Sequence, residues 1–122
     1  MKKAVIIGAG QTGRGFVAPI LKENNYSITF LDENASLIDK LKKEEKYTIH
    51  YFGNVKPNEE ISNFDALQMS DEEVIQRLVD SDVVITSVFS GHLVELVPYL
   101  KKAGSQRQKP LTIICCENGV NV

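Results

Sequence analysis

The chain has 122 residues, of which 43% are hydrophobic and 25% charged, and its formal net charge is −2. This length corresponds to one domain of ordinary globular composition. The slightly acidic balance offers no basic field for nucleic acid or an anionic membrane, and no apolar run approaches the ~20 residues of a membrane span. An anion bound here must therefore be held by local backbone dipoles rather than by net charge.

Short apolar runs alternate with amphipathic stretches along the chain. The β-branched run Ala4–Ile7 is typical of a strand buried on both faces of a parallel sheet. A helix over 16–22 follows, and Pro19 within it predicts a kink or a loosened first turn. The further expected elements are a strand over 26–31, a helix over 35–44 with Asn34 as N-cap, a helix opened by a Ser70–Glu73 capping box and running to Val79, a strand over 82–88, a helix over 92–102 and a strand over 111–116.

The segment 46–68 differs from this alternation. Residues 47–52 are aromatic or β-branched, Gly53-Asn54 is typical of a turn, and 64–68 is a further strand candidate. We expect a small β excursion around residues 46–68. The order of elements predicts an α/β domain over residues 1–122, with a mostly parallel sheet and right-handed crossovers.

A glycine pattern follows the first predicted strand. The run from Gly8 to Gly13 matches G-x-G-x-x-G and leads into the first predicted helix. Gly8 would allow the tight turn, Gly10 the close approach of a pyrophosphate, and Gly13 the packing of helix on sheet. Free backbone N–H groups, with Gln11 and Thr12 among the binding residues, and the positive end of the helix dipole would stabilise the phosphates.

An acidic residue supports this interpretation. Asp32 stands 19 residues after Gly13, at the end of the next predicted strand, where its carboxylate can accept hydrogen bonds from ribose hydroxyls. The same carboxylate would repel a 2′-phosphate, which favours NAD over NADP. The alternatives are a glycine-rich turn without a ligand and a solvated acid at a strand end. We favour a Rossmann-type, doubly wound sheet with NAD as cofactor, since three closely spaced glycines lower stability unless close approach is needed.

Other strand ends should lie at the same edge of the sheet. The small polar residues there would contact the ribose or nicotinamide, unless they serve ordinary turn chemistry; they are Thr86, Ser87, Val88 and Asn118. Arg14 either leans toward a phosphate or is a solvated helix residue. His92 is expected to be a cap or surface residue and His50 to be structural, so no catalytic residue is assigned.

The two cysteines, Cys115 and Cys116, are adjacent. We expect reduced, small core residues in a reducing compartment, the cytoplasm. Two neighbouring cysteines and two distant histidines do not make a zinc site, so no metal is expected.

Longer motifs carry a resemblance to a known family. Val5 to Phe16, with its Gly-Arg-Gly-Phe ending, resembles the opening of mannitol-1-phosphate 5-dehydrogenases and their mannitol dehydrogenase relatives. The resemblance continues through Phe30–Asn34, through Tyr47–Gly53 and into Cys116-Glu117-Asn118, and covers essentially the whole chain. It implies hydride transfer between NAD and a sugar alcohol or its phosphate, without metal. It also implies a lysine base on a helical C-terminal domain that these residues do not contain.

A second hypothesis belongs to another class. Regulatory Rossmann domains attached to potassium channels have a similar length, glycine turn and acid. A stand-alone nucleotide-sensing module is therefore the alternative, although residues 114–119 and the dehydrogenase resemblance argue against it. No nucleic acid or membrane partner is expected in either case.

Overall fold

Five parallel strands form the central sheet of the computed structural model, which describes all residues except 52, 54–55, 89–91 and 117–122. The order is β5-β2-β1-β6-β7, so the chain winds outward from β1 in both directions. The strands are β1 (Lys2–Ile7), β2 (Tyr26–Asp32), β5 (Phe64–Gln68), β6 (Val83–Thr86) and β7 (Ile113–Cys115). This order confirms the doubly wound α/β fold and puts a topological switch point at the carboxyl end of β1, where such sheets bind ligands.

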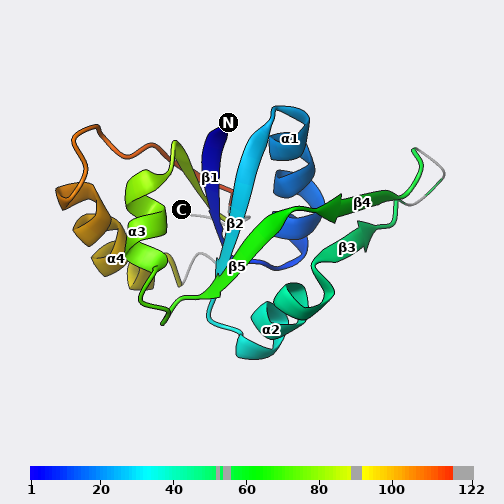
Figure 1. Cartoon of the computed structure of the whole chain (residues 1–122), viewed down its shortest axis with the longest axis horizontal. Coiled ribbons are helices and arrows are strands. Elements are labelled where there is room, and N and C mark those ends of the chain that lie inside the picture. The colour runs from blue at the N-terminus through cyan, green and yellow to red at the C-terminus, as the bar shows by residue number, and fades with distance from the viewer. Residues whose placement is uncertain (52, 54–55, 89–91, 117–122) are drawn as a thin grey trace.

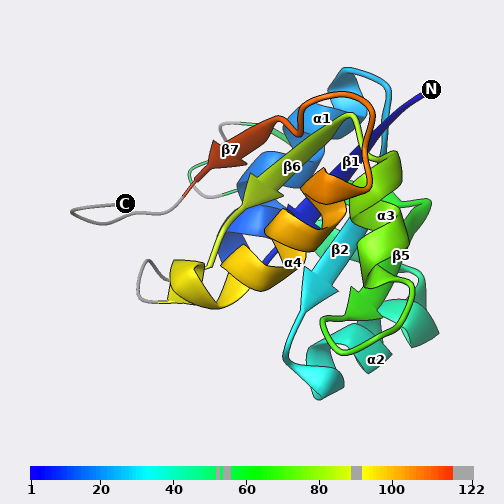
Figure 2. The ribbon, with the colours of Figure 1, turned by 90° about the vertical axis from the view of Figure 1, so that its left-hand side faces the viewer.

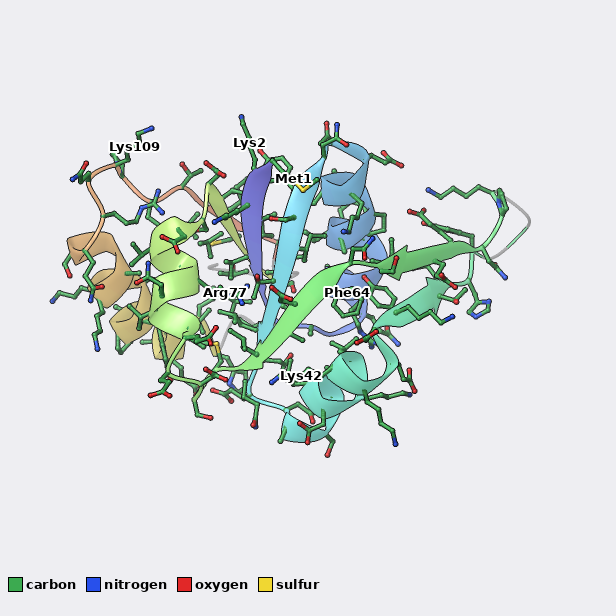
Figure 3. All side chains as sticks on the ribbon, in the orientation of Figure 1. Met1, Lys2, Lys42, Phe64, Arg77 and Lys109 are labelled. Carbon is green, nitrogen blue, oxygen red and sulfur yellow. The ribbon has the colours of Figure 1, made fainter. Side chains whose placement is uncertain are left out.

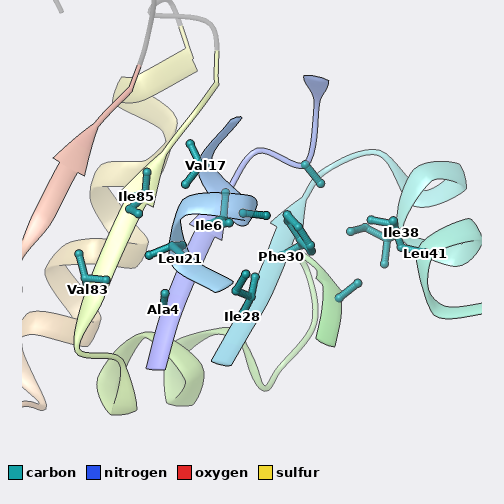
Figure 4. Packing of buried hydrophobic residues seen from close by; sticks show 13 residues of the cluster. Ala4, Ile6, Val17, Leu21, Ile28, Phe30, Ile38, Leu41, Val83 and Ile85 are labelled. Carbon is teal, nitrogen blue, oxygen red and sulfur yellow. The ribbon is translucent and has the colours of Figure 1, made fainter. Parts of the chain in front are cut away.

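Helices cover both faces of the sheet (Figures 1 and 2). On one face lie α1 (Ala18–Glu23) and α2 (Ala35–Glu44), and on the other α3 (Val74–Asp80) and α4 (Leu93–Ser105). Successive residues of the β-branched strands point to opposite faces. The face under α1 and α2 therefore buries Ile6, Phe30 and Ile85 (Figure 4). The face under α3 and α4 buries Ile7, Leu31 and Val84.

Helix α2 agrees with the expected span, and the Asn34 side chain accepts a hydrogen bond from the Leu37 amide at 3.1 Å, as an N-cap does. The prediction that Ser70 and Glu73 form a capping box is wrong. Helix α3 begins only at Val74, and the Asp71 carboxylate accepts the Glu73 amide at 2.9 Å. An aspartate that bonds the backbone two residues on favours a turn, and this turn delays the helix.

The β excursion is shorter than expected. Strands β3 (Lys46–Ile49) and β4 (Glu59–Ser62) form an antiparallel hairpin that projects from the body of the domain (Figure 1). Residues 64–68 do not belong to it, because they pair in parallel with β2 as the edge strand β5. Sequence analysis missed β4, whose two glutamates are poor strand formers. Of the expected turn, Gly53 has a φ of +70°, and Asn54 lies outside the described residues.

Strand β5 is held from both faces of the sheet. On one face the ring of Phe64 lies 5.3 Å from that of Phe30, edge to face. On the other, Arg77 of α3, which is labelled in Figure 3, donates to Asp65 at 2.6 Å and to the Thr29 hydroxyl at 3.2 Å. These contacts fix the strand beside β2, and with it the sheet edge that carries Asp32.

The cysteines differ from the expectation. Both are free thiols, but Cys115 is exposed and Cys116 half-buried, so the prediction of two core residues is wrong. The physical reason is the position of β7 at the edge of the sheet (Figure 2), where Ile113 and Ile114 are also 40% and 48% exposed. Within the described ranges, no helix is long and apolar enough to cross a membrane.

Tyr47 of the hairpin gives a prediction about alkaline stability. Its ring lies 6.1 Å from Phe30 and 5.6 Å from Phe64. Burial raises the pKa of Tyr47, an effect that the charge of Arg14 opposes in part and that of Glu59 reinforces. A tyrosine in the unfolded chain loses its proton near pH 10, so above about pH 10 the unfolded state binds fewer protons and stability falls.

We expect the melting temperature to fall more steeply between about pH 9 and 11 in the wild type than in Tyr47→Phe, since only the wild type carries this tyrosine. Melting curves across that range check the difference, in which the shared lysine titrations cancel. Parallel curves for the two proteins would contradict it.

Candidate dinucleotide site

A cavity of about 650 Å³ lies at the carboxyl ends of β1, β2 and β6. It is open to solvent and is formed where the sheet order reverses, as expected of an α/β ligand site. The residues assigned from the sequence that line it are Gly8, Gly10, Gln11, Thr12, Asp32, Ser87 and Val88. The structure thus brings together seven of the ten predicted cofactor residues.

Two of the glycines are required by the fold itself. Gly8 has a φ of +106°, and a Cβ on it would lie 2.5 Å from the carbonyl oxygen of Ser87. A Cβ on Gly13 would collide with the Gly8 carbonyl oxygen and would lie 2.9 Å from the Ser87 Oγ. The turn therefore lies directly against the end of β6. Side chains at these two positions would push the helix away from the sheet.

Gly10 is different, because a Cβ on it would meet nothing within 4 Å. It lines the cavity, and the fold leaves the space above its backbone open. A glycine there costs conformational entropy without any packing requirement inside the chain. The cavity therefore leaves room for a molecule to approach the backbone of Gly10.

The helix after the turn begins at Gln11 and runs without a break to Glu23. First-turn amides have no acceptor inside their own helix and carry the positive end of its dipole. Between Gly13 and Val17 the helix is π-helical (η1), and α1 follows with Pro19 in its first turn. The expected loosening around Pro19 is confirmed as this widened turn.

Asp32 holds the turn from the neighbouring strand. Its Oδ2 accepts the Ala9 amide at 2.7 Å and its Oδ1 accepts the Asn34 amide at 2.8 Å. A carboxylate has about four lone-pair sites, so about two remain for a ligand in the cavity. Asp32 is therefore a structural anchor of the glycine turn as well as a candidate ribose acceptor.

The residues after β6 separate into different roles. The Ser87 hydroxyl donates to the Gly8 carbonyl at 2.7 Å, so Ser87 supports the turn from below while it also lines the cavity. Thr86 is buried and does not line the cavity, and its Oγ1 has no hydrogen-bond partner in the described part of the chain. Asn118 lies outside the described residues.

The cavity is also lined by residues that sequence analysis did not assign to it: Ile7, Glu33, Met69, His92, Glu95, Leu96 and Cys116. Glu33 and Met69 each come directly after a strand of the sheet, so the strand-end rule could have found them. His92 is exposed at the start of α4, as expected of a surface or cap residue, and its Nδ1 lies 3.3 Å from the Glu95 Oε2. Neither α4 residue carries a motif that would have revealed it.

Fold and site together define a Rossmann dinucleotide-binding domain. The chain belongs to the mannitol dehydrogenase Rossmann domain family, whose model matches residues 2–122. It is 35% identical over 125 aligned positions to a mannitol-1-phosphate 5-dehydrogenase of Thermoanaerobacter pseudethanolicus and 34% identical to one of Caldanaerobacter subterraneus subsp. tengcongensis. In both comparisons 98% of this chain is aligned, but it spans only 32% of the relative's length.

Two solved structures share the fold. One is a putative 2-dehydropantoate 2-reductase from Enterococcus faecalis, with a TM-score of 0.68, 20% identity, and coverage of 99% of this chain and 35% of the other. The second is the TrkA-N domain of the inner membrane protein ybaL from Escherichia coli, with a TM-score of 0.63, 15% identity, and coverage of 97% and 74%. At these identities the likeness shows the fold alone.

The contrast between the glycines generates a prediction. Gly10→Val should leave the melting temperature within a few degrees of the wild type and weaken dinucleotide binding at least tenfold, about 1.4 kcal/mol, because the new side chain enters only the cavity. Gly13→Ala should instead destabilise the fold. Calorimetric titration and thermal melting measure both effects.

Gly104 of α4 provides the control, since a Cβ there also meets nothing within 4 Å but Gly104 does not line the cavity. Gly104→Ala should change neither binding nor the fold. A folded Gly10→Val protein with wild-type affinity would refute the role of Gly10.

Proposed function

We propose that this chain binds NAD as the cofactor domain of an oxidoreductase. The enzyme would transfer hydride between NAD and a sugar alcohol or its phosphate, of the mannitol 1-phosphate or mannitol type. The observation that carries the proposal is the open backbone of Gly10 in the same cavity as the Asp32 carboxylate, in a chain that belongs to the mannitol dehydrogenase Rossmann domain family. The cytoplasmic location expected from the sequence remains part of this proposal.

The charge of the cavity supports NAD over NADP. Three carboxylates line it, those of Asp32, Glu33 and Glu95, and none of the described lining residues is lysine or arginine. A 2′-phosphate on the adenosine ribose would approach Asp32 and Glu33 without a cation to stabilise it. The two ribose hydroxyls of NAD can instead donate to the unused lone pairs of Asp32.

The residues of this chain would bind and orient the cofactor. First-turn amides of Gln11 and Thr12 would face the pyrophosphate, with Gly10 leaving room for it. Bound NAD supplies the hydride acceptor at its nicotinamide ring. The residues that move the substrate proton are proposed to lie in a C-terminal domain outside residues 1–122, in keeping with the 32% of its relatives' length that this chain spans.

The fold is compatible with both an enzyme and a nucleotide sensor. One neighbour in structure bears the name of a reductase and the other that of a TrkA-N domain, and both are alike to this chain in fold alone. The family match, in contrast, rests on sequence over nearly the whole chain. It favours the dehydrogenase.

Turnover of the full encoded protein tests the enzymatic proposal. We expect reduction of NAD, followed by NADH absorbance, with mannitol 1-phosphate or mannitol from a panel of sugar alcohols and their phosphates. The absence of turnover across the whole panel would contradict the dehydrogenase. NAD binding without turnover, together with an association state that changes with NAD or NADH, would support the sensor.

Cofactor selectivity gives a second test. Asp32→Ala should lower the affinity for NAD by roughly ten- to hundredfold, the loss expected for hydrogen bonds to a charged group. The affinity for NADP should fall by less. Some affinity for both will fall because the Ala9 amide also loses its acceptor. Hence the ratio of the two affinities is the measured quantity.

Asp39→Ala, on the exposed side of α2, is the control and should leave the NAD-to-NADP affinity ratio unchanged. An equal loss of NAD and NADP affinity in Asp32→Ala would disprove the ribose role of Asp32 and leave only its structural one.

A further inference from the structure

The widened turn after the glycines has a carbonyl group that its own helix cannot satisfy. The Ala18 amide donates to the Gly13 carbonyl, five residues back. The next residue, Pro19, has no N–H to donate. The Arg14 carbonyl therefore receives neither of the donors four or five residues ahead of it. A backbone carbonyl left without a partner in a partly buried position is costly, so another group has to serve it.

The hairpin supplies that group. The Tyr47 hydroxyl of β3 donates to the Arg14 carbonyl at 2.8 Å, across 33 positions of sequence. Its ring is fixed between Phe30 and Phe64, which directs the hydroxyl. Burial raises the pKa of Tyr47, so the hydroxyl keeps the proton that it donates. Dinucleotide binding alone explains neither Pro19 nor the aromatic hairpin. Both act on the Arg14 carbonyl oxygen: Pro19 cannot donate a hydrogen bond to it, and Tyr47 of the hairpin does.

Arg14 in turn contacts the open glycine. Its amide donates to the Gly10 carbonyl at 3.0 Å, and its Nε lies 3.4 Å from the same oxygen. The Gly10 carbonyl and the Tyr47 hydroxyl are therefore joined through a single residue. A shift of the Arg14 backbone would displace the peptide of Gly10, which lines the cavity.

We propose that Tyr47 is a positioning residue for dinucleotide binding. It closes the π-helical turn in place of the missing Pro19 amide and so holds Arg14 and Gly10 in the geometry that receives the pyrophosphate. This role rests on the proposed function, since it acts on the affinity for the dinucleotide. Tyr47 itself does not line the cavity.

Tyr47→Phe tests the role by removing one oxygen while keeping the ring between Phe30 and Phe64. In the full encoded protein, we expect the affinity for NAD to fall by about two- to tenfold, the equivalent of one net hydrogen bond. Calorimetric titration with NAD, performed well below the melting temperature, measures the change. In turnover assays the KM for NAD should rise, while the KM for the polyol substrate stays the same.

Tyr51→Phe is the matched control. Tyr51 belongs to the same excursion, and its hydroxyl donates to Glu59 at 3.1 Å within that segment. This variant also loses a hydrogen bond of a tyrosine hydroxyl, but it keeps the hydrogen bond from Tyr47 to the Arg14 carbonyl. We expect wild-type affinity for NAD, and an equal loss in the two variants would overturn the proposal.

Pro19→Ala provides a rescue. Alanine restores an N–H at the position where the helix lacks its donor, so the Tyr47 hydroxyl becomes less important. In the Pro19→Ala background, Tyr47→Phe should cost less NAD affinity than in the wild type. A double-mutant cycle measures this coupling, which a purely local packing effect of either residue would not produce. Strictly additive losses would overturn the proposed link between the two residues.

Amide hydrogen exchange without nucleotide separates this inference from the proposed function. Exchange at Gly10 to Phe16 should accelerate in Tyr47→Phe and stay unchanged in Tyr51→Phe. A wild type that binds neither NAD nor NADP would overturn the proposed function and the positioning role with it. Wild-type binding that Tyr47→Phe leaves intact, with unchanged exchange, would overturn the positioning role alone.

Discussion

The contact between the glycine turn and the end of β6 is the constraint on which the site depends. Gly8 and Gly13 lie so close to Ser87 that neither position has room for a Cβ, and the Ser87 hydroxyl bonds the Gly8 carbonyl. This close approach brings the helix start to the sheet edge and places Gly10 among the turn residues that line the cavity. Asp32 fixes the same turn from β2, so two strands on either side of β1 hold it.

Sequence predicted the features that depend on local chemistry. The β-branched runs predicted the parallel strands, Asn34 predicted the start of a helix, and Pro19 predicted the loosened turn. The motif rules gave half of the described residues that line the cavity, because the glycine pattern and the strand ends each follow from neighbouring residues. These elements share one property: their determinants lie within a few positions of one another.

Features that depend on distant contacts were not predicted. The place of 64–68 in the main sheet follows from pairing with β2, and the exposure of Cys115 follows from the edge position of β7. Likewise, nothing near Tyr47 in the sequence indicates that its hydroxyl serves a carbonyl 33 positions earlier. Glu95 lines the cavity through the placement of α4, to which it belongs. Sheet order and helix placement are tertiary facts that periodicity does not encode.

The acidic wall of the cavity has a consequence for selection among cellular nucleotides. The proposed site would hold a pyrophosphate by backbone amides, and its described walls carry carboxylates rather than lysines, so it would gain no long-range attraction for anions. Each additional phosphate on a ligand then adds repulsion without adding a partner. Adenosine triphosphate, which shares the adenosine of NAD but carries more negative charge, would thereby be disfavoured by charge alone. In the proposed site, shape and hydrogen bonding would admit the dinucleotide, and the carboxylates would disfavour its more highly charged competitors.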